Sequence, residues 1–140
     1  MQKKNNVKLL IENNVINKKN FKTFKGNPLL LTNPTDIINF YKKLPRSIGF
    51  LLDVGHLKVS SVSENFDLKD GIIKLNKITN GYHLSDNNGL EDQNKNFTMN
   101  AWFIKYLKKN LNYYTLEIYK TNLNKIYKTK LLLEKFLNKK

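Results

Sequence analysis

The sequence contains no cysteine, and this absence excludes disulfide bonds and thiolate metal sites. It also contains no apolar run long enough for a secretory signal or a membrane span, so we expect a cytoplasmic protein without membrane segments. A chain of 140 residues, 40% of them hydrophobic, can bury one core but not the cores of two ordinary domains. We therefore interpret residues 1–140 as a single domain.

Arginine is nearly absent, although the chain is strongly basic. The net charge is +14, and Arg46 is the only arginine among 25 basic residues. Surfaces that bind nucleic acids favour arginine, because its guanidinium group contacts phosphate and guanine through two hydrogen bonds. The lysines here are scattered and accompany many asparagines and isoleucines, as an AT-rich coding sequence would produce. We therefore attribute the charge to composition and do not expect a nucleic-acid partner.

Four apolar segments typical of β-strands alternate with segments that have helical periodicity. The strands are predicted over Val7–Asn13, Ile48–Val54, Asn80–Asp86 and Tyr113–Lys120. The helices are predicted over Thr32–Leu44, Phe66–Ile78, Thr98–Asn110 and Asn122–Lys139. The link between the first strand and the first helix is long and irregular. This alternation predicts an α/β fold with a parallel sheet and right-handed crossovers.

Acidic residues and histidines are scarce, with 11 and 2 in the chain, so their positions are informative. In parallel sheets, functional groups gather at the carboxyl ends of the strands. The polar residues of this chain fall at those ends: Glu12, then Asp53 with His56 just beyond, then His83 followed by Asp86, and finally Glu117. Both histidines belong to this set, and four successive strands contribute to it.

These residue types indicate a metal site. Oxygen ligands with one imidazole suit Mn²⁺, Mg²⁺, Co²⁺ or Zn²⁺, and strand ends can hold ligands rigidly around one ion. Three carboxylates close together would repel one another unless a cation neutralised them or one of them stayed protonated. Each residue alone would be read as a solvated loop group or a satisfied histidine, but four matching positions on four strands favour one shared divalent ion.

Three segments carry a resemblance to a known family. "LLDVGHLKVS", "NGYHLSDNNGLED" and "YYTLEIYK" resemble the carboxyl-terminal half of the xylose-isomerase-like TIM barrels. That superfamily contains sugar isomerases, ketose epimerases and isomerases, inosose dehydratases and endonuclease IV-type DNA repair nucleases. The most specific part is L-D-x-G-H together with the later H-x-x-D and a glutamate on a strand. The resemblance covers Val7 to about Leu137, as the fifth to eighth strand–helix units of a barrel, that is, a parallel (β/α)4 half-barrel.

The resemblance implies a function as well as a fold. The family's ligands to a divalent metal ion fall on Glu12, Asp53, His83 and Glu117, and His56 matches the histidine that faces the substrate in the epimerases. Glu12 and Glu117 would act as acid and base in proton transfer next to a carbonyl of a sugar or sugar phosphate. The implied protein is therefore a sugar (phosphate) isomerase or epimerase.

Two alternatives remain open because the chain departs from the family pattern. A full barrel has eight units and typically about 250 residues, so the half that supplies part of the substrate pocket is missing. The chain could thus be a non-catalytic remnant or a partner subunit. The second alternative is a nuclease relative that binds DNA, but the histidine that nucleases place after the position of Asp92 is absent from "EDQNKNFT".

A half-barrel also predicts an assembly. Four parallel strands leave both sheet edges open, and the face that would line a barrel interior carries apolar residues. We therefore expect a homo-oligomer, or a separate chain that supplies the amino-terminal half. Light scattering would distinguish these from a lone monomer with a flatter sheet.

Overall fold

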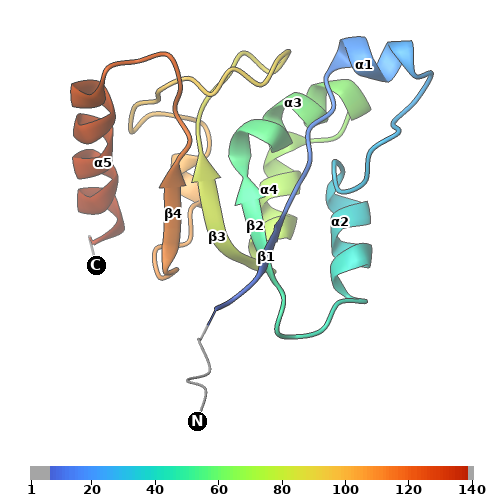
Figure 1. The fold of residues 1–140 in the computed structure, drawn as a ribbon, viewed down its shortest axis with the longest axis horizontal. Coiled ribbons are helices and arrows are strands. Elements are labelled where there is room, and N and C mark those ends of the chain that lie inside the picture. Colours follow the sequence, from blue (N-terminus) through green and yellow to red (C-terminus); the bar gives the residue numbers. More distant parts are fainter. Residues whose placement is uncertain (1–6, 139–140) are drawn as a thin grey trace.

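The computed structural model describes residues 7–138, in which strands and helices alternate along the chain (Figure 1). The strands are β1 (Leu10–Glu12), β2 (Gly49–Asp53), β3 (Thr79–Leu84) and β4 (Tyr113–Leu116). The helices are α1 (Lys18–Thr23), α2 (Pro34–Tyr41), α3 (Val54–Glu64), α4 (Leu68–Asn76), the short 3₁₀ helix η1 (Ile104–Tyr106) and α5 (Leu123–Leu137). The predicted α/β class is confirmed. The expected end of the last helix, Lys139, lies outside the described residues.

The four strands form one sheet in the order β1-β2-β3-β4, and every neighbouring pair is parallel. All strands therefore end at the same edge of the sheet, which is where parallel sheets place their functional groups. A parallel sheet of this order is compatible with half of a TIM barrel. The numbering of its strands as the fifth to eighth of a barrel stays a prediction.

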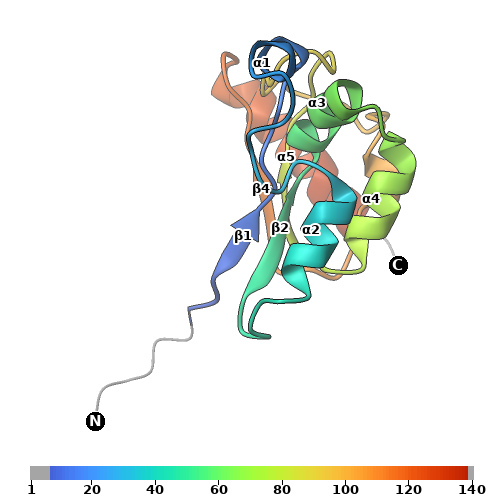
Figure 2. The same ribbon diagram turned by 90° about the vertical axis from the view of Figure 1, so that its right-hand side faces the viewer.

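The core lies between the sheet and the helices on one of its faces. Phe50 and Leu52 of β2 and Tyr82 and Leu84 of β3 are buried and pack in one cluster with helix residues such as Ile37. Figure 2 shows α2 and α4 on this side, while the other side of β1 and β2 carries no described helix. Because side chains alternate along a strand, the residues between the core positions project toward that uncovered face.

Three of the four predicted helices are confirmed. Their expected segments contain α2, α4 and α5, and each begins with the cap that its sequence offers. Asn33, Asp67 and Asn122 are the N-cap residues, and each side chain accepts a hydrogen bond from a backbone N–H of the first turn.

The predicted helix over Thr98–Asn110 is wrong. This segment forms successive turns that contain only η1, and its hydrogen bonds join residues three apart, as in Ala101 N–H to Thr98 O (3.0 Å) and Tyr106 N–H to Phe103 O (2.9 Å). Phe103, Ile104 and Leu107 are nevertheless buried, so the apolar spacing reports burial rather than an α-helix.

Two helices in the structure were not expected from the sequence. The short α1 lies in the link predicted to be irregular, and α3 begins directly after β2. The sequence of α3, "VGHLKVSSVSE", combines a glycine, three serines and β-branched valines, all poor helix formers. Tertiary packing forms it nonetheless, because Val54, Leu57 and Val59 are fully buried.

Candidate metal centre

Strand register places the predicted ligands on one face of the sheet. Asp53 pairs with His83, and His83 pairs with Thr115, two residues before Glu117. Glu12 pairs with Leu51, which lies two residues before Asp53. Paired residues of parallel strands share a face, as do residues two apart on one strand. Glu12, Asp53, His83 and Glu117 therefore project from the uncovered face.

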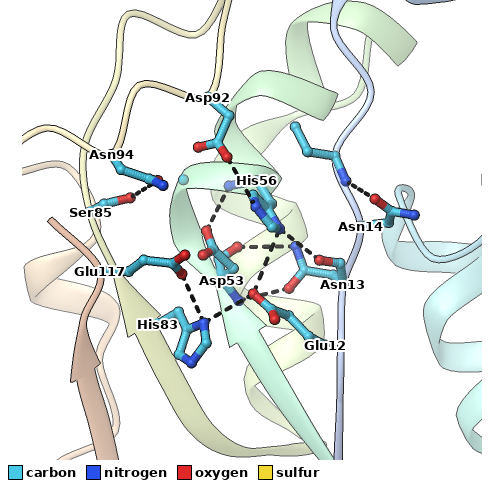
Figure 3. A network of polar contacts seen from close by, with 12 residues as sticks. Glu12, Asn13, Asn14, Asp53, His56, His83, Ser85, Asp92, Asn94 and Glu117 are labelled. Carbon is cyan, nitrogen blue, oxygen red and sulfur yellow. Dashed lines mark hydrogen bonds and ion pairs between the residues drawn. The ribbon is translucent and has the colours of Figure 1, made fainter. Parts of the chain in front are cut away.

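The four side chains meet above the ends of the strands (Figure 3). One ligand atom of each residue can be chosen so that all four atoms lie within 4.8 Å of one another. Donor atoms around one metal ion, each about 2.0–2.6 Å from it, are separated by distances of this size or less. The structure thus brings together the whole ligand set that the sequence indicated.

His83 lies between the two glutamates. Its Nδ1 atom is 3.1 Å from Glu12 Oε1 and 3.0 Å from Glu117 Oε2. The hydrogen bond to Glu12 and then the negative charges around the ring raise the pKa of His83, against the effect of burial. Nδ1 can carry only one proton, so a hydrogen bond to Glu12 leaves the buried Oε2 atom of Glu117 without a donor. A cation between the three groups would satisfy all of them.

Asp53 is the most enclosed member of the cluster. It is fully buried, and its Oδ1 atom accepts a hydrogen bond from the backbone N–H of His56 (2.7 Å), so that it caps α3. Its Oδ2 atom is buried without a hydrogen-bond partner. Burial raises the pKa of Asp53 to about 7, although the charge of His56 opposes this effect. A carboxylate held this way needs a proton or a cation on its free oxygen.

Tyr119 positions the carboxylate of Glu117 from the side away from the cluster. Its Oε1 atom accepts a hydrogen bond from the hydroxyl group of Tyr119 (2.8 Å), which leaves Oε2 directed to the cluster. The backbone N–H of Glu117 donates to Leu84 O (3.1 Å) and so continues the ladder between β3 and β4. One oxygen is thus used for positioning, and the other remains available as a ligand.

His56 lies beside the cluster rather than in it. Its Nδ1 atom donates to the backbone oxygen of Asn13 (2.8 Å), and Nε2 lies 3.2 Å from Asp92 Oδ2. Burial lowers the pKa of His56, but the hydrogen bond to Asp92, the charge of Asp53 and the hydrogen bond to Asn13 outweigh it and raise the pKa to about 9. His56 is therefore an imidazolium ion at neutral pH, and it offsets part of the negative charge of the carboxylates.

Two residues of the site had no role assigned from the sequence. Asn13 joins β1 to β2: its side chain accepts from Asp53 N–H (2.7 Å) and donates to Asp53 O (3.1 Å). Asn13 is buried, but in the sequence the only signal was an asparagine immediately after the glutamate of a predicted strand. Asp92, in the loop after β3, orients His56. By contrast, Asp86 lies outside the cluster and pairs with Lys58 (Nζ to Oδ1, 2.7 Å).

The spacing of D-V-G-H has a local cause in the structure. Asp53 caps α3, His56 supplies the N–H that it accepts, and Gly55 lets the loop after β3 approach the helix. A Cβ atom on Gly55 would lie 2.8 Å from Ser85 Oγ and 3.2 Å from Asn87 Nδ2. Asn87 Nδ2 in turn donates to Gly55 O (2.9 Å). The glycine is therefore required for packing that holds the loop carrying Asp92.

Comparison of the chain with protein-family models, with curated proteins and with solved structures returned no match. The family resemblance therefore continues to depend on the motif residues alone. In the described part of the chain, the helices are all too short or too polar to cross a membrane.

Proposed function

We propose that Glu12, Asp53, His83 and Glu117 bind one divalent cation. The observation that carries this proposal is the convergence of one donor atom from each residue, all within 4.8 Å of one another. Two further features support it: the free oxygens of Asp53 and Glu117 are buried, and a single histidine nitrogen faces two carboxylates. Oxygen donors with one imidazole fit Mn²⁺, Mg²⁺, Co²⁺ or Zn²⁺.

The chemistry that this site would support is proton transfer next to a carbonyl, as in a sugar or sugar phosphate isomerase or epimerase. The bound ion would supply Lewis acidity that polarises a carbonyl group and acidifies the neighbouring C–H bond. Glu12 and Glu117 stand on either side of His83 and are partly exposed, with side-chain exposures of 33% and 24%. One would remove the proton as general base and the other would return it as general acid.

His56 would hold an oxygen atom of the substrate. Its Nδ1–H is already bonded to Asn13, so Nε2 is the atom that could exchange its contact with Asp92 for a substrate oxygen. The charge of the imidazolium would suit a hydroxyl oxygen that becomes more negative as the proton leaves.

Calorimetric titration with Mn²⁺, Co²⁺, Zn²⁺ and Mg²⁺ tests the metal site. We expect one ion per chain for the wild type, and a loss of at least tenfold in affinity for Glu12→Gln and His83→Asn. Glu91→Gln is the matched control, because Glu91 is an exposed glutamate outside the cluster. Equal affinities for wild type and both site variants would show that the ion binds elsewhere.

A separate measurement tests proton transfer. Incubation of the metal-loaded protein with a panel of ketoses and ketose phosphates in D₂O should exchange a C–H for C–D next to the carbonyl, as followed by NMR. Exchange should need both the metal and Glu12. Metal binding without exchange would instead support the non-catalytic alternative.

A further inference from the structure

Both edges of the sheet lack a neighbouring strand in the described residues. The sheet begins at β1 and ends at β4, so each of these strands has backbone groups that no other strand pairs with. Exposed edges of this kind are templates for pairing with another chain unless the protein covers them. The two edges differ in whether a helix lies beside the edge strand, and this difference indicates how they could pair.

The β4 edge has a helix but lacks a strand beneath it. α5 lies beyond β4 in the view of Figure 1, and a groove of about 560 Å³ runs between the two elements. Leu123 and Tyr127 line this groove from α5, with exposures of 81% and 57%, and Tyr114 and Leu116 line it from β4. Leu123, Tyr127 and Leu131 lie four residues apart and form one apolar row along the helix.

The β1 edge has a strand but lacks a helix over it. Leu10 and Glu12 share the uncovered face with Leu51, so Leu9 and Ile11 point to the face that the helices cover elsewhere. Leu9 is nevertheless 60% exposed, and Val7, two residues before it, is 85% exposed. Apolar side chains on the helix side of this strand are therefore left uncovered.

These two edges complement each other. In parallel α/β units, the helix that follows a strand packs over that strand and the next one. Among residues 7–138, no strand follows α5 and no helix precedes β1. Placing β1 of another copy, together with the residues 7–9 that precede it, beside β4 would fill the groove with Val7, Leu9 and Ile11 and would extend the sheet in the parallel sense.

We propose that two copies of this chain form a symmetric dimer in which β1 of each copy pairs with β4 of the other, beneath the other's α5. Four strands from each copy make eight, the number at which a closed barrel has an interior just filled by side chains. Closure leaves no sheet edge and encloses the uncovered face that carries Glu12, Asp53, His83 and Glu117. This inference rests on the edges of the sheet and stands apart from the metal proposal.

The positive charge of the chain predicts how association of two copies depends on salt. Each copy carries a net charge of +14, and Lys130 lines the groove. Like charges oppose association of two copies and salt screens them, so dimer affinity should rise when salt is increased from about 50 to 500 mM. A complex with an acidic partner chain would weaken over the same range.

Light scattering and sedimentation equilibrium at micromolar concentration test the proposal. One chain has a mass of 16.5 kDa, and we expect twice that mass for the wild type. Leu9→Lys and Tyr127→Glu, each at a side chain more than half exposed, should weaken the dimer at least tenfold while leaving the melting temperature of the monomer nearly unchanged. Ile73→Lys is the control, because Ile73 is 49% exposed on α4, away from both edges.

Mixing the two variants distinguishes this arrangement from other dimers. A mixed dimer contains one wild-type contact and one contact between the introduced lysine of a Leu9→Lys chain and the introduced glutamate of a Tyr127→Glu chain. Because these two side chains have opposite charges, we expect the mixture to recover dimers that neither variant forms alone. A well-folded monomer at all salt concentrations, or a dimer that neither substitution weakens, would overturn the proposal.

Discussion

Replacing Asp53 by asparagine removes one negative charge from the cluster while keeping the size and shape of the side chain. It therefore measures the electrostatic cost of the cluster apart from its packing. Asparagine keeps the oxygen that accepts from His56 N–H, and it is as good an N-cap as aspartate, so α3 should be preserved. In place of the buried Oδ2 atom it offers an NH₂ group, which can donate to neighbouring carboxylates such as Glu12 and Glu117. The substitution therefore removes one buried charge without opening a cavity.

The size of the effect follows from the pKa of Asp53. Burial raises this pKa from the ordinary 3.8 to about 7, and each pKa unit corresponds to about 1.4 kcal/mol. Ionised Asp53 at pH 8 thus costs the metal-free protein on the order of 4 kcal/mol, and an amide that replaces it should recover about half of that or more. Since 1 kcal/mol shifts the melting temperature of a domain of this size by about 3–4 °C, we expect Asp53→Asn to melt roughly 6–16 °C higher.

The sign of the pH dependence is fixed by the direction of the pKa shift. The pKa of Asp53 is higher in the folded protein than in the unfolded chain, so the folded state binds the proton more tightly. The stability that this contributes is present below pH 3.8 and is lost as the pH rises through about 7. The advantage of Asp53→Asn should therefore be large at pH 8 and small at pH 5. A divalent ion at 1,000 times its Kd should cancel or reverse this order at pH 8, because it would stabilise the wild type by about 4.1 kcal/mol and leave Asp53→Asn, which lacks a ligand, nearly unaffected.

Thermal melting in chelator at pH 5 and pH 8 measures these differences. Asp67→Asn is the matched control, because Asp67 is also an aspartate N-cap, of α4, but is exposed. It should change the melting temperature little at either pH. If Asp53→Asn were less stable than the wild type at pH 8 without metal, or if its advantage were the same at pH 5, the electrostatic account of the cluster would be refuted.

Four further outcomes are expected. His83→Ala should abolish the stabilisation by Mn²⁺ or Co²⁺ in a thermal shift assay, whereas the metal-free melting temperature should change by only a few degrees. Glu117→Gln should lower the rate of C–H exchange about 10²–10⁴-fold, and equal rates would exclude Glu117 as acid or base. The raised pKa of His56, about 9, contributes stability that is present below pH 6.5 and is lost as the pH rises through 9. Asp92→Asn should lower this pKa, as measured by NMR titration, and should reduce the stability lost between pH 6.5 and pH 9. Gly55→Ala should destabilise the protein by about 1–3 kcal/mol through its contact with the loop after β3, and an unchanged urea midpoint would contradict this.

The strands and the cluster could be predicted from the sequence because both depend on short-range patterns. Continuous apolar segments such as Gly49–Asp53 identify buried parallel strands, and the parallel order then brings the strand ends together. Once Glu12, Asp53, His83 and Glu117 are each placed at a strand end, the parallel topology brings them to one edge of the sheet. The alternation of side chains then puts all four on one face and leaves out Asp86, three residues after His83. The extents of the strands were less predictable: β4 ends at Leu116, before the glutamate, although the apolar pattern continues to Ile118.

Helix α3 could not be predicted because its stability comes from the tertiary structure. Its residues have weak helical propensity, and its buried side chains cover more than one stripe, since Val54, Leu57 and Val59 are all fully buried. The opposite error at Thr98–Asn110 has the same origin. Aromatic residues at helical spacing suggested a helix. The segment that connects β3 to β4 nevertheless buries Phe103 and Ile104 through a series of tight turns.

The arrangement around His56 shows what a ligand motif leaves undetermined. The family resemblance implied that His56 faces the substrate, which stays a prediction. In the structure, the backbone of Asn13 and the side chain of Asp92 contact its two ring nitrogens. Asn13 lies 43 residues before His56 in the sequence, and Asp92 lies far after it, in the loop that follows β3. No local sequence pattern therefore connects these residues with His56. Their effect is to keep the ring protonated beside carboxylates that would otherwise repel one another. Three carboxylates that meet at one point repel one another and make the fold costly. The neighbouring imidazolium of His56 reduces that cost from outside the group of four, so it would not have to move if a cation bound there.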